Sequence, residues 1–310
     1  MKIGIVGTGH VGSTAAYSLV LQGIGNELVL VDHNGALAEA HATDILHASP
    51  FSHPFAIRSG DFHDLAGSAL VILAAGVAQL PGETRMALLQ RNAAIFADIV
   101  PKIVRHAPDA ILLVATNPLD IMTQIAAKIS GLPLGRVFGT GTSLDTARFR
   151  ALLGGLYGVA AGSVHAYVLG EHGDSEVLIW SSATVAGIPL TEFADACGQC
   201  LTREIRERID EDVRRAAYRI INGKGATYYG IGAALAALSR CILFDERKIF
   251  TACSIVSSIG DVKNVALSLP HVIGEGGIRS TLRPSMDEQE IKALRESAAL
   301  IKAGLTELGY

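Results

Sequence analysis

The sequence has little of what marks a membrane, nucleic-acid-binding or disulfide-stabilised protein. Aromatic residues make up 5% of its 310 residues, and its formal net charge is −4. The longest apolar run, Ala69 to Ala78, is about half of the ~20 residues that a membrane-spanning helix needs. No basic stripe with interleaved aromatic residues occurs, so we expect neither a membrane nor a nucleic acid as partner. A strand-like segment begins after one lysine, without a signal-peptide pattern, which favours a cytoplasmic protein.

Cysteine is scarce, and its four positions are Cys197, Cys200, Cys241 and Cys253. Cys197 and Cys200 have the spacing of a zinc-ribbon or redox pair. A zinc ribbon needs a second pair or nearby histidines, and none follows. A redox pair opens a helix after a strand, whereas this pair precedes a long polar helix. We therefore expect neither a metal site nor a redox centre.

The first half of the chain alternates short apolar runs with helical patterns, which is typical of a parallel sheet covered by helices. The runs are continuously apolar, as strands buried on both faces require. The expected strands are Lys2–Val6, Glu27–Asp32, Leu70–Ala75, Ala110–Thr116 and Arg136–Gly139. The expected helices are Gly12–Gln22, Leu37–His47, Thr84–His106 and Ile121–Ser130.

The pattern changes after about residue 142, which indicates a second domain of mixed α+β structure. A long amphipathic helix is predicted at Arg203–Ile221, and a capping box of Ser285 and Glu288 predicts the start of the last helix. The other expected elements are a helix at Ser143–Gly154 and strands at Val164–Leu169, Ile249–Ile255, Val262–Leu269 and Gly276–Thr281. We expect two packed domains, residues 1–142 and 143–310.

A glycine-rich turn with the sequence GTGHVG follows the first strand at residues 7–12 and opens a helix. Glycines in this pattern let backbone N–H groups approach a pyrophosphate at the positive end of a helix. Asp32 ends the second strand at the spacing of an acid that accepts hydrogen bonds from a ribose. A carboxylate there repels a 2′-phosphate, so the sequence predicts a Rossmann domain that binds NAD rather than NADP.

Two further segments follow strands at the edge where open α/β sheets bind ligands. Gly76 follows the third strand and lies among small residues, so a cofactor can approach the backbone there. Thr116-Asn117-Pro118 follows the fourth strand. Asn117 is either a simple turn residue or an amide that binds substrate or the nicotinamide ribose.

The segment LGEHGDS at residues 169–175 places His172 in a glycine-flanked loop after an apolar strand. Its neutral and charged forms are close in energy near neutral pH, so it can exchange a proton with a substrate. Asp145 and Arg148 share one face of a helix, as a surface ion pair or as site residues. In the second interpretation Arg148 grips a substrate carboxylate and Asp145 orients His172. The loop 76–84 resembles a flap that carries Arg85 towards a carbonyl.

These segments together resemble the lactate/malate dehydrogenase family over nearly the whole chain. The matching segments are GTGHVG at 7–12, AGVAQLPGETR at 75–85, ATNPLD at 115–120, GTSLDTARFR at 141–150, VHAYVLGEHGDSE at 164–176 and KGATYYGIG at 224–232. The resemblance implies a homotetramer of chains with an NAD-binding Rossmann domain and a mixed catalytic domain. It also implies a cis bond between Asn117 and Pro118.

The resemblance assigns a role to each candidate residue. His172 is the proton donor and acceptor, Asp145 its partner and Arg85 the group that polarises the carbonyl. Substrate-binding residues are Gln79, Arg85, Asn117, Arg148 and Thr227. Cofactor-binding residues are Gly7, Gly9, Val11, Gly12, Asp32, Gly76, Val77, Thr116, Asn117 and Thr140.

The side-chain pocket separates two related substrates. Malate enzymes of this family carry an arginine at the position of Gln79, and a neutral Gln79 leaves the second carboxylate of oxaloacetate without a partner. We therefore expect pyruvate and L-lactate as substrates, with oxaloacetate and malate as the alternative. Arg150 and His165 match positions that bind fructose 1,6-bisphosphate in bacterial members. The alternative is that Arg150 is an ordinary helix arginine and His165 an ordinary strand histidine. A non-catalytic NAD-binding protein is a third reading, because folds do not fix function.

Overall fold

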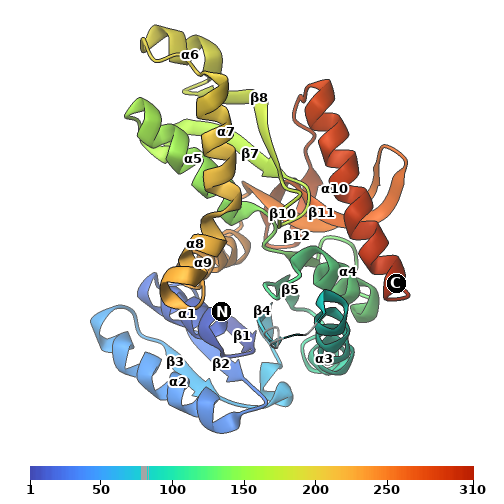
Figure 1. Ribbon diagram of the computed structural model, residues 1–310. Helices are drawn as coiled ribbons and strands as arrows, with labels where there is room; N and C mark the ends of the chain where they lie inside the picture. Colours follow the sequence, from blue (N-terminus) through green and yellow to red (C-terminus); the bar gives the residue numbers. More distant parts are fainter. Residues whose placement is uncertain (78–81, 83) are drawn as a thin grey trace.

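The computed structural model describes residues 1–77, 82 and 84–310. Within these residues a nine-stranded sheet runs through the molecule in the order β12-β11-β10-β6-β5-β4-β1-β2-β3, and β7, β8 and β9 form a smaller sheet (Figure 1). The strands of the large sheet are β1 Lys2–Val6, β2 Glu27–Val31, β3 Ala56–Ser59, β4 Ser68–Leu73, β5 Ile111–Val114, β6 Val137–Gly139, β10 Lys248–Ile259, β11 Val262–Gly274 and β12 Gly277–Thr281.

Strands β1 to β6 are parallel to one another and are covered by helices. The central strand β1 pairs Ile5 with Leu30 of β2 and with Ile72 of β4, and these three side chains are fully buried. The helices of this half are α1 His10–Leu21, α2 Gly35–Ala48, α3 Arg85–His106 and α4 Leu119–Ser130. The carboxyl ends of these parallel strands therefore lie at the same edge of the sheet. The loops after β1, β4 and β5 meet at this edge.

The second half extends the same sheet with antiparallel strands. Strand β10 pairs with β6 through Cys253 and Gly139, and with β11 over most of its length. The smaller sheet has strands β7 Val164–Leu169, β8 Val177–Val185 and β9 Ile188–Pro189. The helices here are α5 Ser143–Tyr157, α6 Leu190–Ala196, α7 Arg203–Arg214, α8 Ala216–Lys224, α9 Tyr229–Leu243 and α10 Glu288–Glu307.

Helix α5 packs on β7 and on α7, around a core that includes Phe149, Leu153 and Ile209. Helix α9 crosses over to α1 in the first half. These contacts join the two halves and place the start of α5 beside the loop after β7. Among the helices in the described part of the chain, none has the length and apolar character to cross a bilayer.

The predicted fold class, a parallel Rossmann sheet with a further α/β half, is confirmed, and β1 and β7 have the predicted bounds. Two predictions were wrong in detail, and several elements were missed. The helix predicted at Arg203–Ile221 is interrupted at Arg215, whose ψ of 0° departs from helical geometry, and forms α7 and α8. The last capping box consists of Asp287 and Glu290, because Asp287 directly precedes α10. Strands β3, β8 and β9 and helices α6 and α9 were not predicted.

Candidate active site

The glycine turn after β1 is packed too tightly for larger residues. Gly7 has a φ of +95°, and a Cβ on it would lie 2.3 Å from the backbone nitrogen of Ala75 after β4. A Cβ on Gly12 would lie 1.9 Å from the carbonyl oxygen of Gly7. A Cβ on Gly9 would meet no described atom within 4 Å. The turn therefore closes on itself at Gly7 and Gly12 and leaves open space beside Gly9.

Helix α1 begins at this turn and offers its N-terminal N–H groups. Its N-cap is Gly9, and within the described residues no side chain caps it and no acid lies in its first turn. The positive end of the helix dipole is therefore uncompensated, which favours an anionic group such as a pyrophosphate. The predicted cofactor residue Val11 lies on the same first turn and is partly buried.

Asp32 lies at the end of β2 next to the turn. Its Oδ2 accepts hydrogen bonds from the backbone N–H of Thr8 at 2.7 Å and from the Thr8 hydroxyl at 3.1 Å, and its Oδ1 accepts from the N–H of Asn34. Burial would raise the pKa of Asp32, but these hydrogen bonds outweigh it and lower the pKa. Asp32 is therefore an anion beside the glycine turn, and a carboxylate at this position repels a 2′-phosphate.

The loops after β4 and β5 complete this edge. Gly76, Val77 and Asn117 are exposed there, while the hydroxyl of Thr116 donates to the carbonyl oxygen of Ala75 at 2.6 Å. A Cβ on Gly76 would lie 2.6 Å from the Thr116 side chain. The peptide bond between Asn117 and Pro118 is cis, as the resemblance implied. Thr140 is buried after β6, where its N–H donates to the carbonyl oxygen of Val114.

Asn92 on α3 joins the two loops, and sequence reasoning missed it. It is 1% exposed, its Oδ1 accepts from the N–H of Val77 at 2.9 Å, and its Nδ2 donates to the carbonyl oxygen of Asn117 at 3.3 Å. The buried amide of Asn92 therefore ties the loop after β4 to the loop after β5. A buried asparagine in a predicted apolar helix face is the signal that could have identified it.

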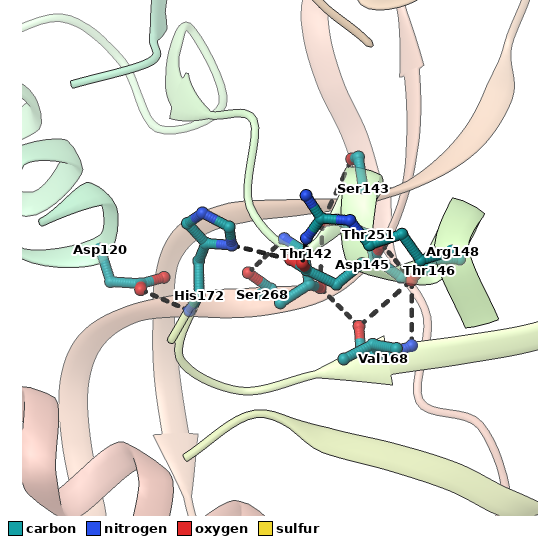
Figure 2. Close-up of polar contacts among 10 residues, drawn as sticks. All are labelled: Asp120, Thr142, Ser143, Asp145, Thr146, Arg148, Val168, His172, Thr251 and Ser268. Carbon is teal, nitrogen blue, oxygen red and sulfur yellow. Dashed lines mark hydrogen bonds and ion pairs between the residues drawn. The ribbon is translucent and has the colours of Figure 1, made fainter. Parts of the chain in front are cut away.

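Two predicted catalytic side chains, His172 and Asp145, and the predicted substrate-binding Arg148 meet at the start of α5. The Nδ1 of His172 donates to Oδ2 of Asp145 at 2.7 Å, and a guanidinium nitrogen of Arg148 donates to Oδ1 of the same carboxylate at 2.6 Å (Figure 2). The Asp145 side chain is 3% exposed, whereas Arg148 and His172 are 17% and 26% exposed. One buried carboxylate therefore holds a guanidinium and an imidazole, which both still reach solvent.

The electrostatics of this cluster favour a charged imidazole. Burial alone would lower the pKa of His172, but the negative charge of Asp145 and the hydrogen bond to it raise the pKa to about 9. Burial would raise the pKa of Asp145, but the charges of His172 and Arg148 and the hydrogen bond keep it low. His172 can therefore store a proton at neutral pH and donate it from Nε2.

A network of buried hydroxyls holds α5 in place. The Thr142 hydroxyl donates to the carbonyl oxygen of Val168, and the N–H of Val168 donates to the Thr146 hydroxyl at 2.9 Å. The N–H of Thr142 donates to the Ser268 hydroxyl on β11 at 3.1 Å. These bonds tie the helix that carries Asp145 to β7, which leads into the loop of His172. Sequence reasoning missed all three hydroxyl residues.

Some predicted substrate residues are placed elsewhere or only in part. Gln79 lies outside the described residues. Of Arg85 the structure describes only its position as the first residue of α3. Thr227 lies in the segment between α8 and α9. No hydrogen bond in the described part of the chain joins Thr227 to the cluster around Asp145.

The two predicted effector residues both lie near Ala166 of β7, with Arg150 partly buried and His165 exposed. The Nε of Arg150 donates to the carbonyl oxygen of Ala166 at 2.9 Å, and its guanidinium lies 5.4 Å from the ring centre of Tyr167. His165 is exposed on β7, directly before Ala166. Among the residues described, no group of side chains is arranged to hold a metal ion, and Cys197 and Cys200 are exposed free thiols.

A Rossmann sheet lies next to a buried aspartate that holds an accessible histidine and an accessible arginine, and this combination defines an NAD-dependent dehydrogenase. Two family models match the chain: the lactate/malate dehydrogenase NAD-binding domain over residues 1–139, and the lactate/malate dehydrogenase alpha/beta C-terminal domain over residues 142–308. The chain belongs to the lactate/malate dehydrogenase family.

Individual relatives are similar over their full lengths. The chain is 60% identical to an L-lactate dehydrogenase of Thermus aquaticus, with 100% of both chains covered. It is 48% identical to an L-lactate dehydrogenase of Deinococcus radiodurans, again over 100% of both. Among solved structures, a lactate dehydrogenase from a Medee basin deep-sea metagenome has a TM-score of 0.97 at 40% identity, covering 100% of this chain and 99% of that one. The predictions of family, of an NAD-dependent enzyme and of NAD as cofactor are confirmed.

Proposed function

We propose that this protein reduces pyruvate to L-lactate with NADH, and that it catalyses the reverse reaction. The observation that carries the proposal is the double use of Asp145, which binds His172 at 2.7 Å and Arg148 at 2.6 Å. A 2-oxo acid has a carbonyl oxygen that needs a proton and an adjacent carboxylate that needs a cation. The pair of accessible side chains matches these two needs, and the curated relatives are L-lactate dehydrogenases.

The reduced nicotinamide supplies a hydride to the keto carbon. His172 gives the proton on Nε2 to the keto oxygen, which becomes the hydroxyl of lactate. Asp145 fixes the tautomer through Nδ1 and stabilises the imidazolium before the transfer. Arg148 has guanidinium N–H groups beyond the one bound to Asp145, and two of them can grip the substrate carboxylate in parallel.

Several further roles belong to the same proposal. Arg85 polarises the carbonyl, and Gln79, Asn117 and Thr227 complete the pocket. The loops after β1, β2, β4 and β5 would hold the cofactor, with residues 1–142 as the nucleotide domain and 143–310 as the catalytic domain. Reduction of pyruvate regenerates NAD, so we place the enzyme in cytoplasmic glycolysis and fermentation.

The decisive experiment measures loss of NADH absorbance when pyruvate or oxaloacetate is added to the purified protein. We expect rapid oxidation with pyruvate and a much lower kcat/KM with oxaloacetate. Rapid oxidation only with oxaloacetate would make the protein a malate dehydrogenase. Binding of NADH without turnover of either acid would make it a non-catalytic NAD-binding protein.

Replacing Gln79 with arginine should move the substrate preference towards oxaloacetate. The new guanidinium pairs with the second carboxylate, whose burial without a partner costs several kcal/mol in principle. We expect the ratio of kcat/KM for oxaloacetate over pyruvate to rise by at least about tenfold, which corresponds to ~1.4 kcal/mol. Gln79→Lys is the matched control for charge without the bidentate fork. An unchanged ratio in Gln79→Arg contradicts this interpretation of the pocket.

We infer that the protein assembles as a homotetramer. Apolar side chains lie unusually exposed on the surface around α1, α2, α8 and α9, which is typical of a protein interface. They are Tyr17 at 45%, Phe51 at 92%, Tyr218 at 49%, Ile221 at 46% and Tyr229 at 67% exposure. The mass in solution, measured by light scattering, tests this inference, and a monomer at micromolar concentration contradicts it.

Fructose 1,6-bisphosphate is expected to lower the KM for pyruvate. Arg150 donates to the carbonyl oxygen of Ala166, the residue after His165 on β7, so we place the effector site at this part of β7. Binding of the effector between subunits favours the assembled state. We expect about a tenfold decrease in KM, within the usual ~1–3 kcal/mol of allosteric coupling. His165→Gln should abolish the decrease and keep the KM measured without effector. A KM that the sugar bisphosphate leaves unchanged in the wild type contradicts the effector site.

A further inference from the structure

A second buried carboxylate contacts the loop of His172 from the side opposite Asp145. The backbone N–H of His172 donates to Oδ2 of Asp120 at 2.8 Å (Figure 2). Asp120 is the second residue of α4 and is 3% exposed. In Figure 2 the imidazole lies between Asp120 on α4 and Asp145 on α5, so two helices from different parts of the chain each contribute one acid next to His172.

In the described part of the chain, few hydrogen-bond donors besides the His172 N–H stabilise the negative charge of Asp120. Within the described residues no N–H or O–H group donates to its Oδ1. The thiol of Cys253 on β10 is a hydrogen-bond donor to Asp120, but a thiol is a weak donor. Burial raises the pKa of Asp120 to about 6, against the effects of Cys253 and of the His172 N–H and charge. At neutral pH the carboxylate is thus mainly ionised, and its strongest partner is the loop that carries His172.

A buried carboxylate with one N–H donor and one thiol is costly for folding alone, because an apolar residue of similar size would avoid burying a charge. The charge of Asp120 acts on the imidazole of His172. After Asp145, Asp120 is the next negative charge that favours the protonated form of His172. The same residue therefore makes a backbone contact and an electrostatic contribution at one catalytic group.

We propose that Asp120 is a positioning residue for His172, which fixes the backbone of the catalytic loop and stabilises the imidazolium from the side opposite Asp145. This inference rests on the proposed role of His172 as proton donor. Asp120 itself touches neither substrate nor cofactor in this proposal, since it acts through the histidine.

Other charged groups also face His172 and set the size of the expected effect. Helix α5 contributes Asp145 and Arg148, and the loop between β7 and β8, which carries His172, contributes Glu176. Burial raises the pKa of Glu176 to about 8. Arg214 on α7 lies behind Glu176 and partly offsets it. Asp145 makes the direct contact with the ring, so Asp120 supplies the smaller share of the stabilisation.

The test compares pH profiles of kcat/KM for pyruvate in the wild type and in Asp120→Asn. Asparagine keeps an acceptor for the His172 N–H but removes the charge, so the pKa of His172 falls. The loss of activity on the alkaline side should therefore move to lower pH by about one unit, at the lower end of the ~1–3 units that a nearby charge produces. Thr123→Val is the matched control, because it changes a buried polar residue on the same helix without changing charge, and its profile should stay in place.

Two further measurements separate the possible outcomes. Asp120→Ser also removes the charge and leaves no amide group to be buried. It replaces Asp120→Asn in the test if that variant does not fold, and it should shift the pH profile in the same direction. Fluorescence titration with NADH should give an unchanged Kd in each folded variant. A lower Tm with an unshifted alkaline limb in the charge-removing variants contradicts the inference and leaves Asp120 a purely structural residue. A wild type without an alkaline limb contradicts the role of His172 instead.

Discussion

Exchange of His172 for glutamine is expected to lower the kcat of pyruvate reduction by about 10²–10⁴-fold, the usual contribution of a positioned acid or base. Glutamine can still donate a hydrogen bond to Asp145 but cannot release a proton to the keto oxygen. The Kd for NADH should change little, because the cofactor candidates belong to the loops after other strands. Steady-state kinetics and fluorescence titration measure the two quantities.

The pKa of His172 also predicts how the rate of each reaction direction changes with pH. With a pKa of about 9, His172 is protonated below that pH, so pyruvate reduction should fall as the pH rises through about 9. Lactate oxidation needs the neutral imidazole and should rise over the same range. Both limbs should be absent in His172→Gln. His63→Gln is the matched control, since His63 is a surface histidine with a 68% exposed side chain. A variant at His172 that keeps the wild-type kcat or the wild-type limbs contradicts the assignment.

Exchange of Arg148 for lysine is expected to raise the KM for pyruvate by about 30-fold to 1000-fold, which corresponds to the ~2–4 kcal/mol typical of a damaged, desolvated charge pair. Lysine keeps the positive charge, but it lacks the planar fork that binds a carboxylate through two parallel hydrogen bonds. It also cannot hold Asp145 and a substrate in the same geometry as the guanidinium that now contacts Asp145 at 2.6 Å.

The control for Arg148→Lys is the same exchange at a surface ion pair. Arg240 donates to Glu246 at 2.9 Å and is 54% exposed, so Arg240→Lys should leave the KM unchanged. A KM in Arg148→Lys within a factor of about two of the wild type would mean that Arg148 is only a helix ion pair with Asp145, the alternative that the sequence left open.

The sequence predicts the parallel part of the sheet because strands buried on both faces are continuous apolar runs. The run at Lys2–Val6 needs no further information, and it matches β1 in full. Helix α9 was missed because its sequence contains glycines that usually disfavour a helix, yet Gly232 lies against Thr14 of α1, where a Cβ would come within 2.6 Å. Tertiary packing therefore overrides local propensity at this crossing.

The residues of the candidate site also differ in whether the sequence alone could predict them. His172, Asp145 and Arg148 were predicted because their residue types and loop context carry the chemistry. Asn92 and Asp120 were not, since each acts through a hydrogen bond to a segment 25 or more residues away in sequence. Such contacts leave no periodic or spacing pattern, and only the folded chain brings their partners together.

The sharing of Asp145 has a consequence for which carbon atoms can react. In the proposed function Arg148 anchors the acid group and His172 supplies the proton. Both are hydrogen-bonded to opposite oxygens of the Asp145 carboxylate, which limits how far they can move apart. In the proposed function this pair therefore sets the distance that must separate the carboxylate and the carbonyl of a substrate. A 3-oxo acid held by the same arginine would place its carbonyl one bond too far along, beyond the reach of the imidazole, so regioselectivity is already built into a single side chain.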